Sequence, residues 1–259
     1  MEEYSAPCLI MPTVLPRFYA PDLDERLEHV ALPRDEGRHL TRVLRLGRGD
    51  EVAVFDGRGA EMRARVEVVG RDEVSVRLLD RLPVADAPLV PVTVVQAVLK
   101  GTSMDAAVRD ATMMGAAAIE PVLTEHTDVK VAVARRPETV DRWRRVALAA
   151  VKQCRRATLP RIQPPLTFDE WLGASTRQRT LVFVEPSARH PARPLSALLA
   201  SPIPASATVL LGPEGGWSEA ELDAAIGAGC VPVVLGPLTL RAESMPVAAL
   251  AALIAIWQK

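Results

Sequence analysis

Polar and apolar residues alternate along the first part of the chain. The alternation runs through residues 51–55, 61–68 and 73–78, and a turn-forming Asp-Gly-Arg-Gly stretch occupies residues 56–59. A period of two predicts strands that bury one face and expose the other. Short strands at this close spacing predict a small antiparallel β-barrel or sandwich. A helical turn over residues 39–46 is expected to precede them.

The spacing of apolar residues changes after a proline-rich stretch. Residues 82–91 contain three prolines, which predicts a linker. The chain is therefore expected to form two domains, residues 1–85 and 86–259.

The second part contains near-continuous apolar runs that alternate with helical patterns. Strands are expected at 92–98, 118–122, 181–184, 208–211 and 231–235, with helices at 103–115, 137–154 and 245–257. Alternating strands and helices predict an α/β domain whose mostly parallel sheet is covered on both faces. The last helix places Val247, Leu250, Leu253, Ile254 and Trp257 on one stripe, which suits either a core position or a dimer interface.

Composition excludes several classes of protein. With 259 residues, of which 49% are hydrophobic, the chain has enough apolar material for a core, unlike disordered or collagen-like chains. The longest apolar run, residues 245–257, is shorter than the roughly 20 residues of a membrane span. The start, Met1-Glu2-Glu3, is acidic where a signal peptide is basic. A soluble cytoplasmic protein is expected, with Met1 and Met11 both left open as the translation start.

Cysteine and histidine spacing predicts no metal site. Cys8, Cys154 and Cys230 are odd in number, far apart and without a CxxC pair, as expected of free thiols in a reducing compartment. The four histidines, at 29, 39, 126 and 190, lack metal-ligand spacing.

Two runs of the chain are locally basic although the net charge is −1. Residues 130–161 hold ten Lys or Arg against two acids, and residues 34–48 hold five arginines against two acids. Each run alone suits a solvated face, but two arginine-dominated runs favour a polyanionic partner, because the planar guanidinium binds phosphate in a bidentate way.

Three loops that follow or bound predicted strands are the candidates for chemistry: residues 185–187, 212–217 and 235–244. In parallel sheets, ligands bind beyond the carboxyl ends of the strands. Glycines at 212, 215 and 216 permit either a close approach to a ligand or simply a tight turn, and Ser218 with Glu221 forms a capping-box pattern. Neither GxGxxG nor a P-loop sequence is present. Arg241 and Glu243 either pair with each other or direct their charged groups into a site.

These stretches together resemble the RsmE family, SPOUT-class methyltransferases that act on 16S ribosomal RNA. The resemblance runs from about Leu15 to Lys259. It rests on residues 16–18, 39–46, Gly49 with Asp50, 55–57, Lys100 with Gly101, Gln153 with Arg156, 212–218, Leu235 with Gly236, and 240–243.

The resemblance implies an N-terminal PUA-like RNA-binding β-barrel and a C-terminal SPOUT α/β domain with a trefoil knot. It also implies S-adenosylmethionine in the knot, a homodimer, and methylation of uridine N3 in 16S rRNA of the 30S subunit. The cofactor-binding residues would be Val184, Glu185, Leu211, Gly212, Glu214, Gly215, Gly216, Leu235, Gly236 and Leu240. The RNA-binding residues would be Arg17, Arg42, Arg45, Arg155 and Arg156.

Methylation at N3 requires loss of the N3 proton, and Arg241 cannot be the base because its guanidinium stays protonated. We expect Arg241 to stabilise the developing uridine anion, with Glu243 as its partner; Glu243 and Glu214 are both left open as the proton acceptor.

Several positions depart from the family's pattern. The main ones are Asp110, Met113, and His126 and Leu238, where arginine is usual in both cases; Lys152 stands where an acid is usual. They keep open two alternatives. One is a divergent SPOUT paralogue with another RNA target, and the other is a non-catalytic RNA-binding or ribosome-assembly protein.

Overall fold

A computed structural model describes residues 15–70, 73–174 and 179–257 of the chain. The chain divides into two compact units, Met1–Val84 and Ala85–Lys259. Cys8 and the two candidate start residues, Met1 and Met11, lie outside the described residues.

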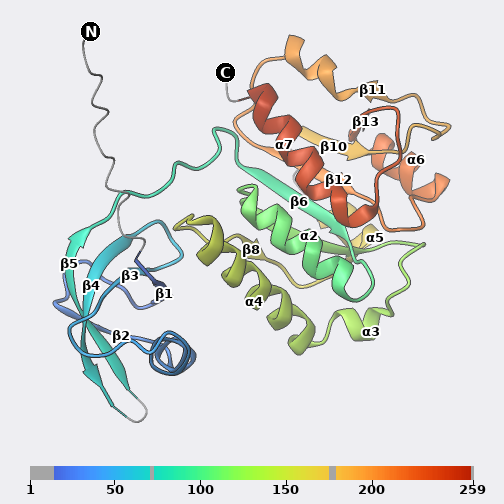
Figure 1. Ribbon diagram of the computed structural model, residues 1–259. Helices are drawn as coiled ribbons and strands as arrows, with labels where there is room; N and C mark the ends of the chain where they lie inside the picture. Colours follow the sequence, from blue (N-terminus) through green and yellow to red (C-terminus); the bar gives the residue numbers. More distant parts are fainter. Residues whose placement is uncertain (1–14, 71–72, 175–178, 258–259) are drawn as a thin grey trace, which may run out of the picture. The chain divides into compact units, whose positions relative to one another are not determined.

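The first unit is a five-stranded sheet with the strand order β1-β3-β4-β5-β2 (Figure 1). Its pairs are antiparallel except β1 with β3, which is parallel. This pair differs from the expected all-antiparallel sheet because β2 and a helical segment, rather than a hairpin turn, connect β1 to β3. The elements are β1 (Arg17–Tyr19), β2 (His29–Ala31), α1 (Arg34–Arg38), the π-helical turn η1 (His39–Val43), β3 (Glu51–Phe55), β4 (Glu61–Val69) and β5 (Val74–Arg81).

The predicted alternation sets the two faces of this sheet. Val52 and Val54 are fully buried and pack with Phe18 in the core of the first unit. On the other face, Arg63 and Arg65 of β4 both pair with the Glu51 carboxylate of β3. The strands expected from the period of two are therefore confirmed, and residues 82–91 lie in neither helix nor strand.

The second unit is a mostly parallel sheet with the order β11-β13-β10-β12-β6-β7-β8, and β9 also pairs with β7. The strands are β6 (Val92–Ala97), β7 (Ala118–Leu123), β8 (Arg161–Ile162), β9 (Leu166–Thr167), β10 (Arg179–Phe183), β11 (Arg193–Pro194), β12 (Ala207–Leu211) and β13 (Val231–Val234). The helices are α2 (Thr102–Met113), α3 (Val131–Ala134), α4 (Pro137–Cys154), α5 (Phe168–Ala174), α6 (Glu219–Gly227) and α7 (Met245–Trp257), with 3-10 turns η2 (Leu195–Ala200) and η3 (Ala242–Ser244).

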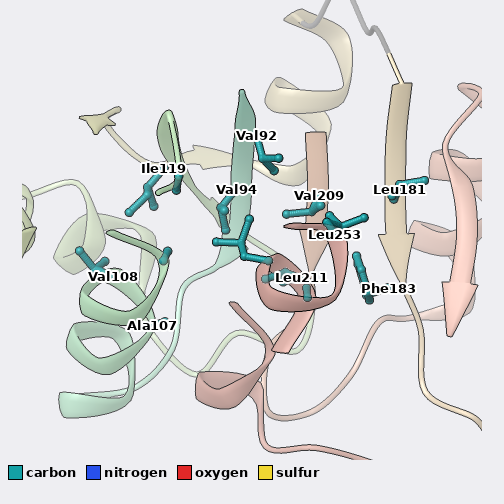
Figure 2. Close-up of a cluster of buried hydrophobic side chains, with 14 of the residues drawn as sticks. Val92, Val94, Ala107, Val108, Ile119, Leu181, Phe183, Val209, Leu211 and Leu253 are labelled. Atoms are coloured by element: carbon teal, nitrogen blue, oxygen red, sulfur yellow. The ribbon is translucent and has the colours of Figure 1, made fainter. Parts of the chain in front are cut away.

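Helices cover this sheet on both faces (Figure 1). Successive residues of a strand point to opposite faces, so Val94 packs in one core, with α2, α4 and α7, while Val95 packs in the other, with α5 and α6. Figure 2 shows the first core, where Val94, Val209 and Leu253 meet. The α/β class and the buried parallel strands are thus confirmed.

The last helix, α7, contributes one face to the first core. Leu250, Leu253 and Trp257 of the predicted stripe are buried, whereas Val247 and Ile254 are half-buried. The core position anticipated for this helix is therefore confirmed.

Candidate functional site

The carboxyl ends of three neighbouring strands, β13, β10 and β12, enclose a cavity of about 760 Å³. This volume lies within the range of about 300–1,000 Å³ that is typical of small-molecule and cofactor sites. All three predicted loops contribute to its lining, and they belong together because parallel strands end at the same edge of a sheet. The lining includes residues 183–190, 212–217, 234–236 and 238–243.

The glycine loop, residues 212–217, begins directly after β12, and contacts within the protein explain two of its glycines. A Cβ atom on Gly212 would lie 3.0 Å from Nε1 of Trp217, which donates a hydrogen bond to the Phe183 carbonyl over 3.0 Å. A Cβ atom on Gly215 would lie 2.9 Å from Cβ of His126. Gly216 has φ +71°, in the region that favours glycine. The loop is therefore packed tightly on its protein side.

The helix α6 leaves this loop through the predicted capping box. The Glu221 amide donates to Oγ of Ser218 over 3.3 Å, and the Ser218 amide donates to Oε2 of Glu221 over 3.1 Å. Two amides that lack partners in a helix are thereby satisfied.

Replacing Ser218 with alanine is expected to lower the free energy of unfolding by about 1 kcal/mol, because one capping bond is lost. Urea denaturation measures this change. Ser196→Ala, at an exposed serine of η2, is the control and should stay within about 0.5 kcal/mol of the parent. An equal change in both variants would contradict a specific capping role.

Arg241 and Glu243 both line the cavity but form only a loose pair. Nη1 of Arg241 lies 3.8 Å from Oε1 of Glu243, and the Arg241 side chain is 86% exposed. The guanidinium is thus accessible to a ligand at the mouth of the cavity. Glu214, a second carboxylate in the lining, accepts a hydrogen bond from the Lys100 amide over 3.1 Å.

The structure brings nearly all the predicted cofactor-binding residues to this cavity, the exception being Leu211. The Leu211 side chain is fully buried in the core between the sheet and α7 (Figure 2). Three further ionisable side chains in the lining, Arg189, His190 and Glu219, were not singled out from the sequence. Arg189 pairs with Glu219 over 2.8 Å, and His190 pairs with Asp223 over 2.8 Å. Arg189 and His190 closely follow the loop at 185–187 in the sequence, and this position could have marked them as candidates.

Two of the five arginines expected to bind RNA are engaged inside the protein. Nη2 of Arg17 lies 2.7 Å from Oε2 of Glu61, both side chains are nearly buried, and the guanidinium lies over the Phe55 ring. Arg156 donates to the carbonyls of Thr112 and Ala116 over 2.9 and 3.1 Å. Burial lowers the pKa of Arg156 from its ordinary value. Both guanidinium groups thus stabilise the fold.

The other three, Arg42, Arg45 and Arg155, are exposed. Arg45 and Arg155 have φ values of +57° and +64°, and they are the only non-glycine residues with positive φ in the part of the chain that the structure describes. This conformation is strained for a residue with a Cβ atom, and such strain is concentrated at functional sites.

Within the second unit, Arg155 lies at the opposite edge of the sheet from the cavity. It follows α4, and the adjacent Arg156 bonds to carbonyls just before β7 begins. The cavity lies at the carboxyl ends of strands parallel to β7. A six-residue strand spans roughly 20 Å, so Arg155 lies too far away to touch a ligand held in the cavity.

The departures from the family's pattern fall at several places. Leu238 lines the cavity and is 76% exposed, and Met113 is an exposed residue of α2. Asp110 pairs with its neighbour Arg109. His126 contacts the glycine loop.

The part of the chain that the structure describes offers few other kinds of site. Among the described residues there is no cluster of His, Cys, Asp or Glu able to hold a metal ion. Cys154 and Cys230 are free thiols. Within the same residues, no helix has the length and hydrophobicity needed to cross a membrane.

Comparison with known families finds two matches. A family described as an RNA methyltransferase domain matches residues 85–254, and one described as an RNA methyltransferase PUA domain matches residues 32–79.

Individual relatives agree with these matches. Ribosomal RNA small subunit methyltransferase E from Synechocystis sp. is 33% identical over 88% of this chain and 73% of its own. The protein of the same name from Mycobacterium bovis is 32% identical over 91% and 89%. The crystal structure of that methyltransferase from Neisseria gonorrhoeae, bound to S-adenosyl methionine, is 29% identical with a TM-score of 0.80, covering 94% of this chain and 98% of its own. A Legionella pneumophila protein solved with bound SAM is 27% identical, with a TM-score of 0.84 over 93% and 97%.

Proposed function

The chain belongs to the RsmE family of RNA methyltransferases, and from this premise we propose that it methylates N3 of a uridine in 16S ribosomal RNA. The reaction uses S-adenosylmethionine. The observation that carries the proposal is the cavity at the ends of β10, β12 and β13, with the exposed Arg241 guanidinium at its lining.

The residues that line the cavity fit S-adenosylmethionine in size and charge. The volume of about 760 Å³ accommodates a nucleoside with an amino-acid tail. The carboxylates of Glu185, Glu214 and Glu243 lie in its lining and suit a ligand that carries ammonium and sulfonium charges. When bound, S-adenosylmethionine supplies an electrophilic methyl group.

The side chains at the cavity mouth suit chemistry at uridine N3. The N3 proton lies on the Watson–Crick edge, so the base must be unpaired or flipped before the protein can reach it. The Arg241 guanidinium would stabilise negative charge that develops on the base when N3 loses its proton. The Glu243 carboxylate either accepts that proton or orients Arg241, and Glu214 is the other candidate acceptor.

RNA would be held mainly by arginines that remain free to meet phosphates. Arg42 and Arg45 in the first unit, and Arg155 in the second, are exposed, whereas Arg17 and Arg156 are engaged within the protein. We therefore assign the phosphate contacts to the first three. Exposed arginines bind RNA phosphates with the release of counterions.

Combining Arg42→Ala with Arg45→Gly is expected to weaken RNA binding and to lower the slope of log affinity against log salt by about 1.5, because two phosphate contacts are lost. Glycine is chosen at position 45 because it adopts φ +57° without strain. Filter binding of a 16S rRNA fragment at several salt concentrations measures the slope. Arg26→Ala, at an exposed arginine already paired with Asp24, should leave the slope unchanged. An unchanged slope in the double variant would show that Arg42 and Arg45 do not contact the RNA phosphates.

A homodimer, the 30S subunit as substrate and a cytoplasmic location complete the proposal. The outward face of α7 supports self-association, because it carries the exposed residues Ala251 and Ala255 beside the half-buried Val247. Light scattering of the purified protein tests the dimer.

The test of the function has two parts. Calorimetry is expected to show S-adenosylmethionine binding to the purified protein, and mass spectrometry of rRNA from a deletion strain is expected to show one unmethylated uridine. Loss of the methyl group from a uridine of another RNA would favour a divergent paralogue. The apolar Leu238 in the cavity lining makes such a paralogue the second candidate. If the cofactor does not bind either with or without RNA, the proposed methyltransferase activity is refuted and a non-catalytic RNA-binding protein is favoured.

A further inference from the structure

A histidine outside the cavity contacts the glycine loop, residues 212–217, on the side away from the cavity. His126 lies in the turn that follows β7, and its Nδ1 atom is 3.1 Å from the Gly215 carbonyl oxygen and 3.1 Å from that of Gly216. Gly215 and Gly216 line the cavity, whereas His126 does not. The side chain therefore touches the loop on the face turned away from the ligand.

The chemistry of this contact requires a hydrogen on Nδ1 of the ring. Both partners of Nδ1 are carbonyl oxygens, which only accept hydrogen bonds. Nδ1 must therefore carry a hydrogen, so the neutral ring is the Nδ1–H tautomer with its lone pair on Nε2. One N–H is shared between two carbonyls and restrains the orientation of both peptide groups.

The turn that carries His126 is itself fixed. The Thr124 and Thr127 hydroxyls lie 2.8 Å apart, and the Thr127 amide donates to the Thr124 carbonyl over 3.1 Å. The Glu125 amide donates to Oε1 of Glu221 over 2.8 Å, which ties the turn to the start of α6. The histidine thus acts from a rigid support.

We propose that His126 is a positioning residue for the methyl transfer: its Nδ1–H holds the Gly215–Gly216 backbone in the conformation that binds S-adenosylmethionine. The inference rests on the proposed function, because it assumes that this loop binds the cofactor. The close backbone approach at Gly215, where a Cβ atom would lie 2.9 Å from His126, shows that the loop has no room to relax toward the turn.

The expected consequence is an effect on cofactor affinity rather than on turnover. His126→Leu removes the donor and should raise the Kd and KM for S-adenosylmethionine about five-fold, as expected for one lost hydrogen bond. The kcat should remain near that of the parent, because Arg241 and Glu243 belong to a different loop and the Glu214 carboxylate is held separately by the Lys100 amide. His126→Asn should bind within about two-fold of the parent, because its Nδ2 atom occupies the place of Nδ1. His29→Leu, in the first unit and paired with Glu67, is the matched control and should change neither constant.

Two results would overturn the proposal. The first is a His126→Leu variant with parental Kd and KM. The second is an asparagine variant as weak as the leucine variant, since that would indicate ring packing rather than hydrogen bonding. Thermal melting of each variant separates a loss of affinity from a loss of folding.

The tautomer gives an independent readout on the cofactor-free protein. Long-range ¹H–¹⁵N spectra should show a hydrogen on Nδ1 of His126, and a ring protonated on Nε2 alone would overturn the contact. A parent protein that does not bind the cofactor would refute the proposed function. If such a protein still showed the Nδ1–H form, His126 would be a structural clamp, and the positioning role would be wrong as well.

Discussion

Valine in place of Gly215 is expected to weaken S-adenosylmethionine binding by about 100-fold. An added Cβ atom would lie 2.9 Å from Cβ of His126, which is closer than two carbon atoms approach without displacement. The turn carrying His126 is held by Glu221 and cannot retreat, so the glycine loop must move toward the cavity. Overpacking of this kind costs about 1–3 kcal/mol, and the upper end corresponds to the expected factor.

Calorimetric titration with S-adenosylmethionine measures this loss. Gly227→Val is the matched control, because Gly227 is exposed and a Cβ atom there would meet nothing within 4 Å. The control should bind as the parent does. Parental affinity in Gly215→Val, with a normal melting temperature, would show that the loop does not bind the cofactor. Gly215→Ala, a smaller change, covers the case in which the valine variant does not fold.

Loss of the Arg241 guanidinium is expected to lower kcat about 100- to 1,000-fold, the effect typical of removing one donor that stabilises a developing anion. The Kd for S-adenosylmethionine should change less than about two-fold, because the side chain is 86% exposed and its pairing with Glu243, at 3.8 Å, is loose. Methylation of a 16S rRNA fragment by Arg241→Ala under single-turnover conditions measures the chemical step.

Two further variants define the role of Arg241. Arg241→Lys should recover part of the rate, because lysine keeps the charge but not the planar fork. Arg193→Ala, an exposed arginine of β11 outside the cavity, should react at the parental rate. A kcat of Arg241→Ala equal to that of the parent would exclude the assignment, while a rise in Kd alone would make Arg241 a binding residue.

Segments whose pattern is long or punctuated were predictable from the sequence. Pro137 at the first turn and an amphipathic pattern placed a helix at residues 137–154, and α4 has these bounds. The strand predicted at residues 51–55 likewise has the bounds of β3, although Ala53 and Phe55 are buried as well as Val52 and Val54, so burial does not alternate there. By contrast, β1 and β2 have only three residues, and β8, β9 and β11 only two. A strand this short contains too few positions to show a period, and only its neighbours in the sheet make it a strand.

The candidate site shows the same division. The sequence indicated the loops at 185–187, 212–217 and 235–244, because each follows or bounds a predicted strand. That the first two and much of the third line one cavity follows from the strand order β13-β10-β12, which local pattern does not contain.

What the sequence by itself determined is the alternation of buried and exposed positions, the α/β class and the turns, since these depend on residues close together in the chain. Only the tertiary structure decided which arginines are free. Nothing in the local sequence separates Arg17 and Arg156 from Arg42 and Arg45. In the folded chain, however, Glu61 binds Arg17 and the Thr112 carbonyl binds Arg156. The contact between His126 and Gly215 likewise joins residues almost ninety positions apart. A side chain's partner depends on distances in space, and those exist only once the chain has folded.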